Sequence, residues 1–149
     1  MIFVKVTIYN TQKAYKINKR AITNQVLALL KFLSIKTDEI ILHFVGSKKI
    51  SSLHNQFFND PSVTDCISFP LDSDSDEPYK ILGEIFVCPK VAFEYAKKNN
   101  EDYQSELTLY VVHGILHLLG FDDIEESERR VMKKNEKKCI EFLKSNNLL

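Results

Sequence analysis

The chain has 149 residues, about the size of one domain, and its 44% hydrophobic and 11% aromatic content is that of a globular protein. Its 20 basic and 20 acidic residues cancel, so no overall field draws it to nucleic acid or to a membrane surface. No apolar run approaches the ~20 residues that cross a bilayer, and we expect no membrane-spanning helix. The N-terminus lacks the pattern of a secretory signal, so we expect a cytoplasmic protein.

The first half of the chain alternates between predicted strands and helices. Apolar and polar side chains alternate over residues 2–9, which is the period-two pattern of a strand. Apolar residues at helical spacing over 22–33 predict an amphipathic helix that covers a sheet. Residues 39–45 predict a second strand, and a helix with Ser47 as its N-cap should follow. The side chains expected to face inward from that helix are Ile50, Leu53 and Phe57.

The next part of the chain predicts a pair of strands and a short helix. Residues 64–69 and 83–88 read as strands, and the turn formers and acidic residues of 70–78 suit an antiparallel connection between them. Pro89 is expected in the first turn of a helix that ends near Asn99.

Two further helices complete the predicted fold. Residues 107–119 are apolar on nearly every side, which predicts a buried helix that ends at Gly120. The last helix, over 124–143, is expected to pack its apolar side chains and leave its basic ones in solvent. The element order predicts a single α+β domain spanning 1–149, with a small mixed four-stranded β-sheet packed against about five helices. The residues expected to pack from the last helix are Val131, Met132, Cys139 and Phe142.

The buried helix carries two histidines four residues apart. His113 and His117 share one helix face at a spacing from which two imidazoles can converge on one cation. Gly120 allows the chain to fold back, so that the carboxylate of Asp123 can supply a third ligand. Gly114, which lacks a side chain, is expected to leave room beside His113 for water or a substrate group. The sequence therefore predicts a metal site at His113, His117 and Asp123.

Other interpretations of these residues stay open. Each histidine could be a core residue that is hydrogen-bonded to the backbone, although a shared ion would satisfy both. Asp123 could cap the last helix, with Glu126 as its reciprocal partner. Asp122 is either that cap or a group that orients a ligand imidazole.

An ion with three protein ligands keeps an open position, where it can acidify water or polarise a phosphoryl oxygen. The chemistry that this favours is hydrolysis. The zinc-protease motif H-E-x-x-H is similar, but Gly114 stands where its general base would be, which disfavours peptide hydrolysis. The three cysteines, Cys66, Cys88 and Cys139, form no C-x-x-C pair and are expected to be buried thiols.

Residues 113–123, H-G-I-L-H-L-L-G-F-D-D, resemble the H-G-x-L-H-L-x-G-[YF]-D-H motif of the YbeY family. Residues 64–70, T-D-C-I-S-F-P, resemble the family's T-D-V-L-S-F-P, and residues 83–85, G-E-I, resemble its G-D-I. The resemblance implies a metal-dependent endoribonuclease that acts on single-stranded RNA in small-subunit (16S) ribosomal RNA maturation and ribosome quality control. It further implies one divalent ion, with Zn²⁺ expected, and ribosomal RNA, the small ribosomal subunit and assembly proteins as partners.

The sequence departs from the family pattern at two positions. Asp123 stands where the family usually has histidine, which should hold the ion more tightly and acidify water less. Phe58 stands where family members carry an arginine thought to contact RNA phosphate or to help cleavage. Phe57 and Phe58 are expected either to pack in the core or to stack on a base.

Charged segments give weaker signals. A basic N-terminal segment could contact an RNA backbone or simply be a solvated edge. The acidic loop 72–77 would repel RNA. Asp65 and Ser68 are expected in a cleft beside the ion, since they belong to a family motif. The basic residues of the N-terminal segment are Lys5, Lys13, Lys16, Lys19 and Arg20.

Two rival functions remain at this point. The ion could be structural in a non-catalytic ribosome-assembly factor, for which Phe58 is the best support; a fourth protein ligand would then close its coordination. The same centre could also hydrolyse a different substrate.

Overall fold

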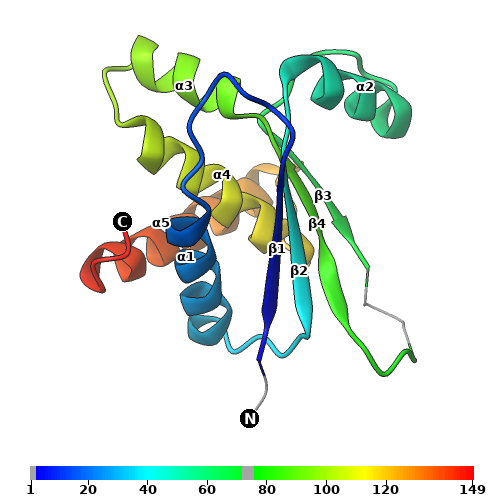
Figure 1. Cartoon of the computed structure of the whole chain (residues 1–149), viewed down its shortest axis with the longest axis vertical. Coiled ribbons are helices and arrows are strands. Elements are labelled where there is room, and N and C mark those ends of the chain that lie inside the picture. Colours follow the sequence, from blue (N-terminus) through cyan, green and yellow to red (C-terminus); the bar gives the residue numbers. More distant parts are fainter. Residues whose placement is uncertain (1–2, 72–75) are drawn as a thin grey trace.

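The computed structural model describes residues 3–71 and 76–149. Within them the chain forms five helices and a four-stranded sheet in the predicted order (Figure 1). Ile2, at the start of the first predicted strand, and residues 72–75 of the acidic loop lie outside the described residues. The elements are β1 (Lys5–Asn10), α1 (Lys19–Phe32), β2 (Glu39–Phe44), α2 (Ser47–Phe58), β3 (Cys66–Pro70), β4 (Ile81–Val87), α3 (Pro89–Lys98), α4 (Tyr103–Leu118) and α5 (Glu126–Ser145).

The sheet is mixed, as predicted. Its strand order is β1-β2-β4-β3, with β1 parallel to β2, β2 parallel to β4, and β3 antiparallel to β4. Side chains of the central strands alternate between a buried and a partly exposed face. The antiparallel connection expected between β3 and β4 is therefore confirmed.

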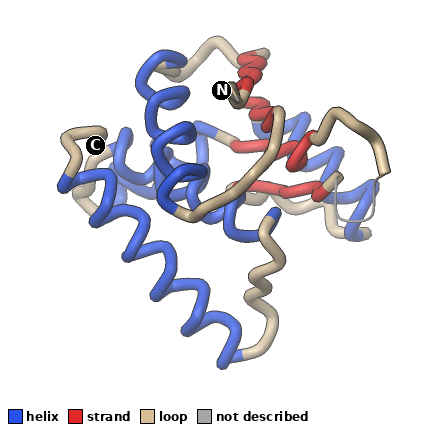
Figure 2. Tube along the Cα trace, turned by 90° about the horizontal axis from the view of Figure 1, so that it is seen from below, coloured by secondary structure: helices blue, strands red, loops and turns tan. Residues whose placement is uncertain are grey.

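Most of the helices cover one face of this sheet (Figures 1 and 2). Helix α4 packs against β3, β4, α3 and α5, and its side chains are buried on most sides, which confirms the predicted buried helix. Helix α2 lies apart from this layer, where Ile50 contacts a smaller apolar cluster with Val45, Ile67 and Cys88. Among the described helices, none is both long enough and apolar enough to span a bilayer.

The N-caps of α4 and α2 explain why these helices begin elsewhere than the sequence predicts. Helix α4 starts at Tyr103 because the side chain of Asp102 accepts a hydrogen bond from the backbone N–H of Ser105, at 2.9 Å. The prediction that Ser47 caps α2 is wrong. Gly46 is the N-cap, and its carbonyl accepts the N–H of Ile50 at 3.1 Å, so Ser47 is already helical.

Two side chains expected in the core are exposed. Phe57, at the end of α2, is 54% exposed, and its ring lies edge-to-face with Phe69 of β3. Val131 is 48% exposed because the buried stripe of α5 runs through Met132, Cys139 and Leu143, one position away around the helix.

Gly114 does not open space beside the histidines, as the sequence suggested, but lets α4 approach the sheet closely. A Cβ at this position would lie 2.6 Å from Ile85 Cγ2 on β4. The Oγ of Ser68 on β3 also donates to the Gly114 carbonyl at 3.0 Å. The glycine therefore sets the short distance between α4 and the strands β3 and β4.

Gly114→Ala should lower the free energy of unfolding by about 2 kcal/mol through overpacking, although alanine favours a helix. Ile85→Ala should cost about 3 kcal/mol by itself. The double variant should lose at least about 1 kcal/mol less unfolding free energy than the two single variants lose together, because the new methyl group no longer meets Ile85. Urea unfolding of the four proteins measures this coupling. Additive effects would show that α4 is not held against Ile85.

Candidate metal centre

The end of α4 turns the chain back toward the histidines. Gly120 has φ +98°, a left-handed conformation suited to glycine, and its N–H donates to the carbonyl of His117 at 3.0 Å. The N–H of Phe121 donates to the carbonyl of Leu116 at 3.1 Å. These two bonds form a Schellman motif, which ends the helix and directs the following residues over its last turns.

Asp123 is not the cap of α5, so that interpretation is wrong. Glu125 is the N-cap, and its side chain and that of Glu128 each accept a hydrogen bond from the other residue's backbone N–H. Asp122, which does not cap α5 either, is exposed and lines the cleft beside the histidines. The carboxylate of Asp123 is therefore available to the histidine pair.

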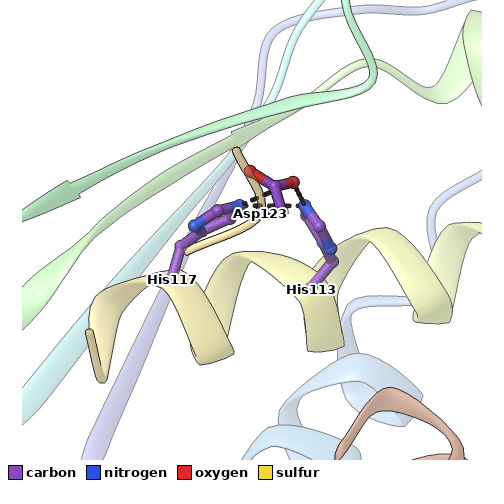
Figure 3. A group of neighbouring side chains, drawn as sticks. All are labelled: His113, His117 and Asp123. Atoms are coloured by element: carbon purple, nitrogen blue, oxygen red, sulfur yellow. Dashed lines mark hydrogen bonds and ion pairs between the residues drawn. The ribbon is translucent and has the colours of Figure 1, made fainter. Parts of the chain in front are cut away.

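Three ligand atoms converge above α4 (Figure 3). The Nε2 atoms of His113 and His117 are 3.0 Å apart, and Asp123 Oδ2 lies 3.4 Å from the first and 3.5 Å from the second. Ligands about 2.1 Å from a tetrahedral ion are about 3.4 Å from one another. These side chains, all partly buried, have the separations that such an ion requires, and they are the group of described residues that could hold one.

Glu136 of α5 is a neighbour of the site that the sequence did not single out. Its Oε1 lies 3.5 Å from His113 Nδ1, the ring nitrogen that points away from the other two ligands. Burial lowers the pKa of His113, but the hydrogen bond and charge of Glu136, together with nearby aspartates, outweigh burial and raise that pKa. A carboxylate behind a ligand imidazole orients the ring and increases its basicity.

Glu136→Gln should weaken divalent-metal binding about tenfold, because the neutral amide no longer supports the His113 ring. Titration of the metal-free protein with Zn²⁺ against a competing chelator measures this change. Glu141→Gln, an exposed position on the same helix, is the matched control and should bind as the wild type does. Equal affinities for the wild type and Glu136→Gln would contradict the orienting role.

The ligands face a cleft of about 490 Å³. Asp65 lines it and holds the start of β3, with its Oδ1 accepting the N–H of Cys66 at 2.7 Å. Ser68 lies there too, although its hydroxyl is bound to the Gly114 carbonyl. Cys66 is partly buried and also lines the cleft, whereas Cys88 and Cys139 do not. Cys88 and Cys139 are buried as expected, whereas Cys66 is buried in part and burial raises the pKa of its thiol.

Of the two interpretations of Phe58, packing in the core is wrong. Phe58 lies in the same cleft and is 57% exposed. Basic residues that could replace the charge of the family's arginine are Lys48, Lys49, Arg129 and Arg130, and none of them is among the described residues that line the cleft. Arg129 donates to the carbonyl of Ile124, and Arg130 is paired with Glu126 at 2.7 Å. The basic N-terminal residues are likewise absent from the described cleft lining.

Known proteins match the chain over most of its length. The sequence profile of the family described as "Endoribonuclease YbeY" matches residues 7–144. A protein with that name from Protochlamydia amoebophila is 52% identical over 107 residues, which are 72% of this chain and 71% of that protein. Another from Chlamydia pneumoniae is 35% identical over 98% of this chain and 95% of its own length.

The fold is also that of a solved structure. The solution structure of TM1509 from Thermotoga maritima has a TM-score of 0.64 and 26% sequence identity, and the match covers 96% of this chain and 94% of that one. The match of the family profile, the extent of the relatives and the shared fold agree with one another. The chain belongs to the YbeY endoribonuclease family.

Proposed function

We propose that this protein is a metal-dependent endoribonuclease that cuts single-stranded RNA. The observation that carries the proposal is the convergence of His113, His117 and Asp123 on one point at the wall of an open cleft. Membership of the YbeY endoribonuclease family supports the same reaction. We further propose that residues 1–149 act as one cytoplasmic domain, with ribosomal RNA and the small subunit as partners in 16S maturation and quality control.

The residues of the site have separate tasks in this proposal. The two histidines and Asp123 hold one divalent ion, for which two imidazoles and a carboxylate suit Zn²⁺. Such an ion supplies Lewis acidity, which acidifies water and stabilises the negative charge that develops on a phosphate. Glu136 keeps the ring of His113 turned toward the ligands. Asp123 lowers the net positive charge of the occupied site compared with a third imidazole.

A non-catalytic assembly factor with a structural ion is the second candidate. The described lining of the cleft contains neither lysine nor arginine to receive a phosphate, and this observation favours it. A structural ion would need a fourth protein ligand, and the convergent group of described residues has three members, which favours the enzyme.

Removal and return of the metal should test the function. Treatment with a chelator should abolish cleavage of a single-stranded fragment of precursor 16S RNA, and one equivalent of Zn²⁺ should restore it. The same fragment annealed to its complement should be cut much more slowly. Ester and nucleotide substrates, assayed beside the RNA, identify any different hydrolase activity. If the reloaded protein binds the RNA and leaves it intact, the assembly-factor function replaces the enzymatic one.

A further inference from the structure

Phe58 is an exposed ring in the cleft of the metal centre. It is 57% exposed and lines the cleft together with His113, His117 and Asp123. An aromatic side chain that exposed contributes little apolar burial to folding. Its neighbour Phe57 has nearly the same exposure, 54%, but its ring contacts Phe69 and it is not among the described residues of the cleft lining.

The ring of Phe58 packs against His54, and α2 ends directly after it. His54, one turn earlier on α2, lies against it with 5.6 Å between ring centroids, and the Nδ1–H of His54 donates to the carbonyl of Ser62 at 3.0 Å. Asn59 then ends the helix in a left-handed conformation, with its N–H bound to the carbonyl of Asn55. Phe58 therefore packs against His54, and more than half of its surface stays exposed beside the cleft.

The charged residues of the cleft do not favour the binding of a nucleic acid strand. Asp65, Asp122 and Asp123 line it, and its described lining contains no lysine or arginine. The phosphates of a nucleic acid would therefore meet no permanently charged cation among these described residues. Affinity for a strand must then come from the bound ion and from uncharged contacts. Aromatic rings provide such contacts for single strands, because every base has a face that can stack.

We propose that Phe58 forms a nucleobase subsite, in which an unstacked base of single-stranded RNA lies on the exposed ring while an adjacent phosphate lies at His113, His117 and Asp123. The inference rests on the proposed function and adds to it the contact that selects a single strand. A paired base keeps both faces stacked in its helix and has none to offer to the ring.

Fluorescence can detect this contact directly, because the chain contains no tryptophan. Phe58→Trp and Phe57→Trp each create a protein with one tryptophan, at neighbouring positions of similar exposure, and selective excitation separates its emission from that of the tyrosines. With Zn²⁺-loaded protein and octaadenylate RNA, read by stopped flow before turnover, emission from Phe58→Trp should fall by roughly half as a base stacks on it. Emission from Phe57→Trp should stay constant. An abasic ribose-phosphate chain of equal length should quench neither protein.

Affinity provides the second measurement. Phe58→Leu keeps an apolar side chain but should raise the Kd for octaadenylate about tenfold, whereas Phe58→Tyr should bind as the wild type does. Phe57→Leu is the control and should change the Kd less than about twofold. Circular dichroism verifies that each variant is folded. An unchanged Kd for Phe58→Leu, or equal quenching of both tryptophan variants, would overturn the subsite.

The two proposals fail in different ways. If the wild type cleaves RNA but Phe58→Leu binds it equally well, the nuclease stands and the nucleobase subsite does not. If octaadenylate quenches Phe58→Trp selectively but the metal-loaded wild type cuts no RNA, the subsite stands and the enzymatic function does not.

Discussion

His113→Ala and His117→Ala should each reduce RNA cleavage by at least about 10³-fold, because loss of a ligand removes the ion whose charge stabilisation contributes several kcal/mol. Bound metal, measured by elemental analysis of the purified proteins, should fall from about one ion per chain to nearly none. The rate is read as kcat/KM on a single-stranded RNA. Retention of full activity and metal by either variant would refute the assignment of that histidine.

His43 provides a control for the His113→Ala and His117→Ala variants. His43 of β2 is also partly buried and also contacts a carboxylate, with its Nε2 2.9 Å from Glu84 Oε1. It is not among the described residues of the cleft lining. His43→Ala should therefore keep both the metal and the activity, which shows that loss of a partly buried imidazole is not by itself inactivating.

The same variants separate a catalytic ion from a structural one. Helix α4 is held by apolar contacts to β3, β4, α3 and α5 on its other sides, so its position does not depend on an ion. The metal-free wild type and His117→Ala should therefore both unfold cooperatively, with Tm values within a few degrees of each other. Both should unfold below the metal-loaded wild type only by the amount that binding of the ion adds to the native state. A structural site would instead lose its fold with its metal.

The features that could be predicted from the sequence are those fixed by local geometry. Four-residue spacing places His113 and His117 on one face wherever the helix packs, and Gly120 ends that helix through bonds within six residues. The order of strands and helices follows in the same way from apolar periodicity. The ligand group could be proposed from sequence because all three members lie within one helix end and its turn.

The features that could not be predicted depend on how distant elements pack. The role of Gly114 is set by Ile85 on another element, and the exposure of Phe58 by where α2 ends relative to the cleft. One local feature of the sequence could have indicated Glu136. It falls in the apolar stripe of α5, four residues after Met132 and three before Cys139, and an acidic residue in such a stripe needs a buried partner.

Asp123→Ala should weaken metal binding at least about 100-fold and lower cleavage in parallel, because two imidazoles alone hold a divalent ion poorly. Asp122→Ala removes the neighbouring carboxylate of the same cleft, which is not in the convergent group, and should leave metal affinity nearly unchanged. The pair of variants separates ligation from the general negative charge of this loop. Competition titrations with Zn²⁺ and a chelator measure both affinities.

Asp123→His should keep the metal but change how the rate depends on pH. A carboxylate cancels more of the ion's charge than a neutral imidazole does, so it acidifies the activated water less. The pH of half-maximal kcat should therefore fall by about one unit in Asp123→His, giving a roughly tenfold faster reaction on the acidic limb. A weaker hold on the ion should accompany this gain, since the anionic ligand is lost. An unchanged pH profile in a fully metal-loaded variant would show that ionisation of water at the centre does not control the rate.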